Sequence, residues 1–417
     1  MGKAVKYLGI IDYLQYFYLY CMICFGGMST PFRMSNDTFL LFILISSSTI
    51  ILLKGASLKK LTSKVVTFLC ILFVSLVLVI LTAPLTLGTS LSIILAIEIC
   101  YATYLLNPKK FLSRLVLLIL LLASFSLIMY AMTLYLGFDA MVNLCKPIST
   151  PVFSSVREQL YSYNLYIYNL VYVHSDRNCG PFGEPGQYQC VLTSVLFFLL
   201  FYPEKINIKY KFFSIGILIA TILTTQSTTG YISFVILVVC YYSYSCVTAH
   251  VDKRILNVFK LSILVIVLFI LFTDLGESFL QTTIYNKFDF EKKEILASGG
   301  ARTEGIYGAL NLMASHPEVL WGIGFDNALL NVRSESGFLI YLLAIGFIPF
   351  SILYGYLLYL AFHSSHHKFE SFAKVLLVLN MSLGQPHIMN PVLFLIILYP
   401  FFIKKSKFYE NNLDYVY

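Results

Sequence analysis

The chain has 417 residues, of which 58% are hydrophobic and only 12% are charged, and its mean hydropathy is +0.79. A soluble domain of this size needs far more charged surface, so this composition excludes a soluble core for most of the chain. The net charge of +8 is therefore not interpreted as a sign of nucleic-acid binding. We attribute it to the way lysine and arginine are distributed along a membrane protein.

Apolar runs of about 20 residues are long enough to cross the ~30 Å hydrocarbon layer as helices. We expect an all-α, polytopic integral membrane protein, a single transmembrane domain over residues 1–417, with about twelve spans. The expected spans are 7–28, 38–53, 65–83, 88–106, 115–137, 186–202, 212–226, 229–248, 255–273, 336–362, 375–389 and 391–403. The last two flank Gln385-Pro386-His387 and are also compatible with one re-entrant hairpin.

Connections rich in Lys and Arg alternate with connections that are poorer in them. The basic connections are 54–64, 107–114, 203–211, 250–254 and 363–374. Because cytoplasmic loops carry the excess of Lys and Arg, this alternation predicts that both termini are cytoplasmic. The first hydrophobic segment is expected to serve as an uncleaved anchor.

Two outer loops are long, the first from Phe138 to Pro185 and the second from Asp274 to Glu335. Loops of this size with structure of their own usually carry function. In the second loop, an amphipathic helix is expected because apolar residues recur at helical spacing at Ile306, Leu310 and Met313.

A run of tyrosines marks the first outer loop. Its members are Tyr161, Tyr163, Tyr166, Tyr168 and Tyr172. We interpret the run as an amphipathic helix on the bilayer surface, with stacking on sugar rings as the alternative.

Acidic residues within apolar helices are expensive and by default functional, and a proton-coupled transporter would use Asp12 and Glu98 in this way. Asp12 also falls near the expected start of a helix. Cys145 and Cys179 share the first outer loop and could form a disulfide in an oxidising compartment. We found no zinc-binding spacing, no phosphate-binding P-loop and no dinucleotide fingerprint, so no metal and no cofactor are expected.

The segment Arg177-Asn178-Cys179-Gly180-Pro181-Phe182-Gly183-Glu184-Pro185-Gly186 comes just before the chain re-enters the membrane. Glycine and proline turns constrain its backbone and hold an arginine and a glutamate beside lipid headgroups. An arginine binds phosphate through charge-assisted hydrogen bonds, and a carboxylate can accept a proton. The pattern is typical of an active site.

Further motifs follow this segment in order: Thr225-Gln226-Ser227-Thr228-Thr229-Gly230-Tyr231, Gly300-Ala301-Arg302, His316-Pro317, Gly322-Ile323-Gly324-Phe325, and Ser336-Gly337-Phe338-Leu339 with Gly346. Together they cover roughly residues 150–350. In this order and topology, the chain resembles the O-antigen polymerases of the Wzy type. The O-antigen ligases belong to the same glycosyltransferase superfamily and share the pattern.

The resemblance implies a glycosyltransferase on the periplasmic face of the bacterial inner membrane, acting on undecaprenyl-diphosphate-linked glycan without any nucleotide. A sugar hydroxyl of one repeat unit attacks the anomeric carbon of a growing chain, and undecaprenyl diphosphate leaves. The implied partners are the lipid-linked glycan and the bilayer, with a chain-length regulator and a flippase as further candidates and no nucleic acid. An O-antigen ligase and a lipid-linked-glycan flippase or other transporter remain the alternatives.

Arginine suits a leaving diphosphate because its planar fork binds phosphate oxygens bidentately and stays charged. We therefore expect Arg177 and Arg302 to bind the diphosphate, with Arg302 in the first turn of a helix where free backbone amides favour anions. Arg157 and Arg333 are lesser candidates.

Three residues are candidates for handling the acceptor proton. Related ligases have a histidine shortly before the segment that corresponds to Ser336-Gly337-Phe338-Leu339, and this chain has Glu335 there. A carboxylate can serve as the base if burial raises its pKa, although Glu335 is equally compatible with a loop acid paired to Arg333. His316 is the alternative base. Glu184 either contacts sugar or holds the loop together.

Overall fold

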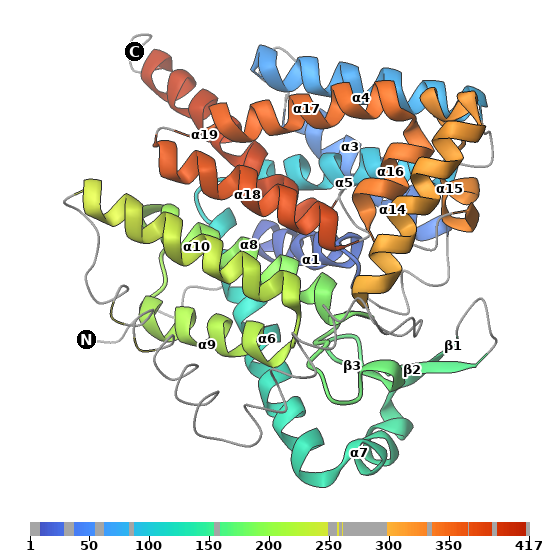
Figure 1. The fold of residues 1–417 in the computed structure, drawn as a ribbon. Helices are drawn as coiled ribbons and strands as arrows, with labels where there is room; N and C mark the ends of the chain where they lie inside the picture. Colours follow the sequence, from blue (N-terminus) through green and yellow to red (C-terminus); the bar gives the residue numbers. More distant parts are fainter. Residues whose placement is uncertain are drawn as a thin grey trace. The chain divides into compact units, whose positions relative to one another are not determined.

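The computed structural model describes residues 9–28, 37–54, 62–82, 87–153, 159–248, 257, 261, 298–331, 336–365, 367–385 and 390–413. The described chain is mostly helical (Figure 1). It divides into two compact units. The first comprises residues 1–60, 92–221 and 389–395, and the second comprises residues 61–91, 222–388 and 396–417.

The described part of the first unit contains four long helices, one helix of eight residues and most of two others. They are α1 (Ile10–Phe25), α3 (Asp37–Leu53), most of α5 (Leu87–Leu106), α6 (Phe111–Leu136), α7 (Phe138–Cys145), α8 (Pro185–Phe201) and most of α9 (Lys211–Thr224). Short 3₁₀ turns, η3 (Lys146–Ile148), η4 (Tyr172–His174) and η5 (Pro203–Lys205), connect them. Helix α6 packs against both α1 and α8.

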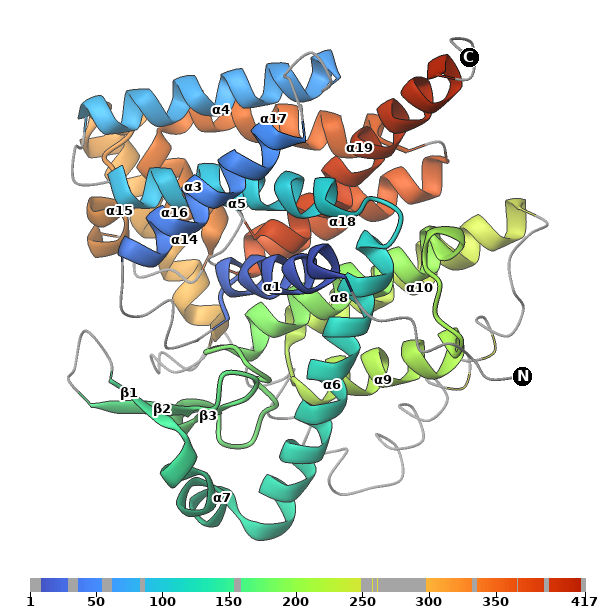
Figure 2. The same cartoon turned by 180° about the vertical axis from the view of Figure 1, so that it is seen from behind.

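The second unit is also helical. It contains α4 (Ser63–Thr82), α10 (Thr228–Val247), α14 (Ser298–Ser315), η7 (Pro317–Leu320), α15 (Phe325–Asn331), α16 (Gly337–Ile345), α17 (Phe347–His363), α18 (Lys368–Gly384) and most of α19 (Pro391–Leu413). Helices α4 and α17 run side by side (Figures 1 and 2). Helix α18 packs along α10, where Asn380 Nδ2 donates to Thr229 O at 2.9 Å and to Ser233 Oγ at 2.7 Å.

Four of the described helices are long and apolar enough to cross a membrane, at 63–81, 89–106, 111–136 and 228–247. Six shorter apolar helices lie at 10–25, 39–53, 185–201, 211–224, 347–363 and 391–403. These helices fall on the expected apolar runs and suggest a membrane protein. Apart from residues 257 and 261, the expected span 255–273 lies outside the described residues, as does 386–389 of the expected hairpin turn. The count of twelve spans stays a prediction.

The expected span 336–362 is not one continuous helix. It is divided into α16 and α17 at Gly346, whose φ is +101°. A Cβ at Gly346 would overlap the backbone of Trp321 and Gly322, so the close approach of two chain segments fixes the break at a glycine.

The mostly helical chain also contains a small antiparallel sheet. Strands β1 (Thr150–Phe153), β2 (Leu160–Asn164) and β3 (Asn169–Val171) pair in the order β1-β2-β3. Tyr161 and Tyr163 lie on β2, so the prediction of an amphipathic helix across the tyrosine run is wrong. Beta-branched and aromatic residues favour strands, and successive residues of β2 point to opposite faces of the sheet.

The first outer loop has a hydrophobic core of its own. Buried side chains from α6, α7 and the sheet form one cluster: Met129, Met141, Val142, Cys145, Tyr163, Tyr168 and Leu170. The segment from α7 to β3 is therefore a packed subdomain beyond the end of α6 (Figure 1), and not an extended connector.

The amphipathic helix expected in the second outer loop exists as α14, but it buries a different face. Ala309 is buried, whereas Leu310 is 55% exposed. Gly305 is also buried, and it lies one helical turn before Ala309 on the same face. Among the described side chains of the helix, the two small residues Gly305 and Ala309 are the buried ones.

Both intramembrane acids have polar partners within the first unit. Asp12 is the third residue of α1 and pairs with Arg114 of α6, which confirms its place near a helix end. Glu98 of α5 accepts hydrogen bonds from Ser47 Oγ at 2.8 Å and Ser48 Oγ at 2.6 Å, both on α3. Each acid thus has a structural role in joining helices, which weakens the transporter interpretation.

Candidate functional site

The motif before α8 is a buried loop with a charged residue at each end. Residues 178–183 are all buried, whereas Arg177 and Glu184 are half-buried. Glu184 occupies the N-cap position of α8, and Pro185 is the first helical residue. Proline is well suited to this position because its missing N–H would have no partner within the helix. The sequence therefore fixes the point where the loop ends and α8 begins.

One side of the loop is fixed to helix α6. Asn178 Nδ2 donates to Ser126 Oγ at 3.3 Å, and Asn178 Oδ1 accepts from the backbone N–H of Gly180 at 3.0 Å. The hydroxyl of Tyr130 donates to the backbone oxygen of Asp176 at 2.9 Å. These bonds flank Arg177, so its backbone is held on both sides.

Tyr188 of α8 packs against the loop. Its side chain is fully buried, and its hydroxyl lies 3.0 Å from Ser126 Oγ. Its ring stacks on Phe182, with centroids 5.4 Å apart. Gly180 has a φ of +52° and lies against this ring, so that any Cβ there would overlap it. Glycine is required here both by conformation and by space.

Residues of strands β2 and β3 form hydrogen bonds with the other side of the loop. The backbone N–H of Asn169 donates to Gly180 O at 2.7 Å, and Asn169 Nδ2 donates to Phe182 O at 3.1 Å. Tyr161 donates from its hydroxyl to Gly183 O at 2.9 Å. The loop is thus hydrogen-bonded to the sheet, to α6 and within itself, and its two charged residues are carried on a fixed backbone.

The loop also contains a buried thiol, that of Cys179. Burial raises the pKa of the Cys179 thiol, the charge of Arg177 acts to lower that pKa, and the charges of Glu184 and Asp176 raise it further. Arg177 and Glu184 thus have opposite effects on the pKa of the same buried thiol. Cys179 and Cys145 are both free thiols, so the disulfide considered from the sequence is not formed.

Arg302 does not lie in the first turn of its helix. Helix α14 begins at Ser298, so Arg302 is its fifth residue and follows the free N-terminal amides. The argument from helix N-terminal amides consequently does not apply to it. Its side chain, and the whole of Arg157, Arg333 and Glu335, lie outside the described residues.

His316 directly follows α14 and is exposed. Its Nδ1 lies 2.7 Å from Ser315 Oγ, and Pro317 begins the next turn. An exposed ring in this position is accessible to substrate. Exposure is also usual for a histidine at the end of a helix. Arg177 and Glu184 belong to the first unit, while Arg302 and His316 belong to the second.

The glycine motif of the second unit has a structural role. The backbone N–H groups of Ile323 and Gly324 donate to Leu343 O and Ala344 O, each at 3.1 Å. Gly322 has a φ of +105°, and a Cβ there would overlap the backbone of α16. The motif thus fastens the segment after η7 to α16, in an arrangement that larger residues would prevent.

Among the residues that the structure describes, no three His, Cys, Asp or Glu side chains are placed to hold a metal. No family model, curated protein or solved structure matches the chain. What the fold and the site define is a mostly helical protein with apolar helices typical of membranes and a packed, hydrogen-bonded loop that presents an arginine and a glutamate.

Sequence reasoning missed the residues that support this loop. Ser126, Tyr130 and Tyr188 were hidden inside expected spans, where a hydroxyl is unremarkable in an apolar run. The alternation of Tyr161 and Tyr163 was the one available signal for β2, because residues two apart share a face of a strand.

Proposed function

We propose that this protein polymerises undecaprenyl-diphosphate-linked oligosaccharide repeat units into an O-antigen-like surface polysaccharide. In this reaction a sugar hydroxyl of the incoming unit attacks the anomeric carbon of the growing chain. The bond from that carbon to the carrier diphosphate breaks, a glycosidic bond forms, and undecaprenyl diphosphate leaves. The hydroxyl proton passes to a base on the protein.

The observation that carries the proposal is the fixed loop ending in Arg177 and Glu184. A guanidinium that is held in place before substrate arrives can stabilise the charge that develops on the diphosphate, without the cost of reorganisation during the reaction. The half-buried position strengthens its electrostatic interaction relative to bulk water. Glu184, at the other end of the loop, either contacts the sugar or orients Arg177.

The remaining roles rest on the resemblance. Arg302 is the second proposed diphosphate ligand, and Glu335 is the proposed base with His316 as the alternative. The proposal further places the protein in the inner membrane with about twelve spans. Because positively charged residues favour the cytoplasmic side, both termini are cytoplasmic and the two long loops face the periplasm. A chain-length regulator and a flippase are proposed partners.

Deletion of the protein from its host tests the proposal. The surface polysaccharide is then separated on a gel, with the intact chain restored from a plasmid as the first control and Lys209→Ala as the second. Lys209 is exposed and lies outside the loop, so its loss should leave polymer unchanged. A product with a single repeat supports the proposal. Unligated carrier-linked polymer would indicate a ligase, and cytoplasmic accumulation of the lipid-linked unit would indicate a flippase.

A further inference from the structure

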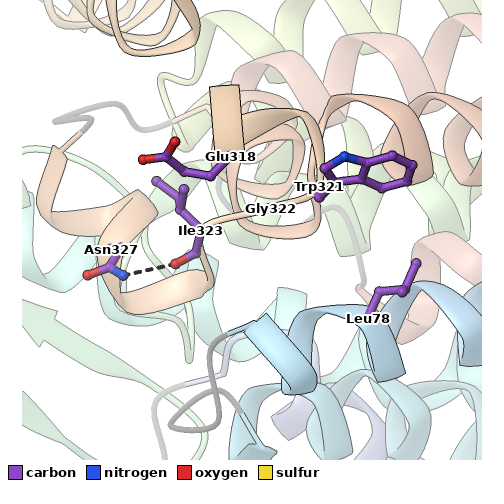
Figure 3. A pocket seen from close by; sticks show the side chains of 6 residues that line it. All are labelled: Leu78, Glu318, Trp321, Gly322, Ile323 and Asn327. Carbon is purple, nitrogen blue, oxygen red and sulfur yellow. Dashed lines mark hydrogen bonds between the residues drawn. The ribbon is translucent and has the colours of Figure 1, made fainter. Parts of the chain in front are cut away.

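A pocket of about 600 Å³ opens in the second unit. It is lined by Leu78, Glu318, Trp321, Gly322, Ile323 and Asn327 (Figure 3). Leu78 lies near the end of α4 that is opposite its basic start at Lys64. The other lining residues come from η7, from the segment that follows it and, for Asn327, from α15. By the expected topology, this is the outer end of the helix, on the side of the second long loop.

The lining divides into an apolar part and a polar part. Trp321 and Leu78 lie on one side, and the indole of Trp321 is 54% exposed. The carboxylate of Glu318 and the amide of Asn327 lie on the other side (Figure 3). Asn327 Nδ2 donates to Ile323 O at 2.9 Å, which orients the amide.

This division matches the chemistry of a sugar ring. A pyranose has a C–H face that packs on an aromatic ring and a periphery of hydroxyls that donate to carboxylate and amide oxygens. The single negative charge of Glu318 disfavours anionic ligands.

We propose that this pocket binds a neutral sugar ring of a glycan, with Trp321 beneath the ring and with Glu318 and Asn327 accepting from its hydroxyls. The inference goes beyond the proposed function because it assigns a second glycan contact to residues that have no role in the proposed reaction. It concerns binding alone, so its test does not depend on polymerisation.

Trp321 is the sole tryptophan of the chain, and its fluorescence therefore reports on this pocket alone. Purified protein in lipid nanodiscs is titrated with maltotriose, with chitotriose and with oligosaccharides released by mild acid from the host's own polysaccharide. Trigalacturonate is the anionic counterpart. We expect a saturable change in emission with at least one neutral probe and a weaker response to trigalacturonate.

Calorimetry of the same probe then measures the variants independently of fluorescence. Glu318→Gln and Asn327→Ala should each weaken binding about tenfold, as expected when a hydrogen bond to a buried or charged group is lost. Trp321→Leu should abolish it. Glu204→Gln and Asn311→Ala are matched controls on exposed residues elsewhere and should change the affinity less than about twofold.

Two outcomes would overturn the inference. One is the absence of saturable binding with every neutral probe, or an affinity that the pocket variants leave unchanged. The other is strong quenching of Trp321 by brominated lipids together with no response to sugar, which would make the indole a membrane-interface anchor. A polymerisation defect in the deleted host would stand in either case, so the two proposals fail separately.

Discussion

Gly180 and Tyr188 are in such close contact that the glycine cannot carry a side chain. The two residues belong to the loop and to the first turn of α8, and Tyr188 is itself tied to Ser126 of α6. The position of Arg177 thus depends on a contact between a glycine and an aromatic ring that is not part of the reaction.

The first prediction is that Gly180→Ala destabilises this loop. A left-handed conformation costs a non-glycine residue roughly 1–2 kcal/mol, and the overlap with the ring of Tyr188 adds to this. Faster proteolysis of the loop and a lower thermal midpoint of the purified protein would show the effect. Gly216→Ala on α9 is the matched control, because a Cβ there meets no described atom within 4 Å. Equal behaviour of the two variants would refute the prediction.

The second prediction concerns the diphosphate residues. Arg177→Ala and Arg302→Ala should each lower polymerisation about 100-fold or more while the protein still accumulates in the membrane. Lysine should restore activity only partly at either position, because it keeps the charge and loses the bidentate fork. Chain growth is measured with purified enzyme and synthetic lipid-linked repeat units. Near-normal growth in an alanine variant would remove that arginine from the site.

The third prediction separates the two candidate bases. Glu335→Gln is nearly isosteric and cannot accept the proton, so it should stop chain growth while lipid-linked substrate still binds. His316→Ala should keep substantial activity, in agreement with the exposed position of the ring at the end of α14. The reverse pattern would exchange their roles. A chelator should leave the wild-type rate unchanged, and loss of activity on chelation would contradict the metal-free mechanism.

The fourth prediction concerns the thiol of Cys179. Burial raises its pKa, so the folded protein keeps the neutral thiol at a pH where the unfolded chain, with a pKa near 8.5, already ionises. Because only the unfolded state is stabilised by ionisation of this thiol, the free energy of unfolding decreases as the pH rises above about 8.5. Alkylation of Cys179 by iodoacetamide should be slow in folded protein and fast after denaturation. Rapid alkylation of the folded protein at neutral pH would contradict the buried loop.

The fifth prediction concerns topology. Lys59, Lys110 and Lys253 should face the cytoplasm, whereas Arg177 and Arg302 should face outward. Cysteines are introduced at these positions after Cys70 and Cys246, the two exposed native cysteines, have been replaced by serine. An impermeant thiol reagent applied to intact, outer-membrane-permeabilised cells should label position 302 and not position 110. Labelling at 302 that appears only after lysis would reverse the orientation.

Hydropathy alone predicted most of the helices, because a long apolar run has few alternatives in a protein of this composition. It failed where local sequence is ambiguous. Tyr161 to Tyr172 is compatible with both an amphipathic helix and short strands, and the pairing of β2 with β1 and β3 decided between them. Gly346 interrupts an otherwise continuous apolar run because of a contact with Gly322, which no local pattern reveals.

The sequence predicted the loop, but it did not predict the contacts that hold the loop in place. Glycines, prolines and two charged residues in ten positions indicated a constrained polar turn. The partners that fix it lie tens of residues away, as with Asn178 and Ser126 or Gly183 and Tyr161. Such contacts depend on how α6, α8 and the sheet pack, so they follow from the tertiary structure alone.

The pairing of Ser126 with Tyr188 also constrains the order of assembly during synthesis. Helix α6 leaves the ribosome first, and the loop that follows it has no supporting ring until the chain has been extended past position 188. A nascent chain that ends before α8 should therefore expose Asn178 and its neighbours to proteases, even though every residue of the loop is already present. The loop can therefore reach its folded structure only after the segment that follows it has been translated.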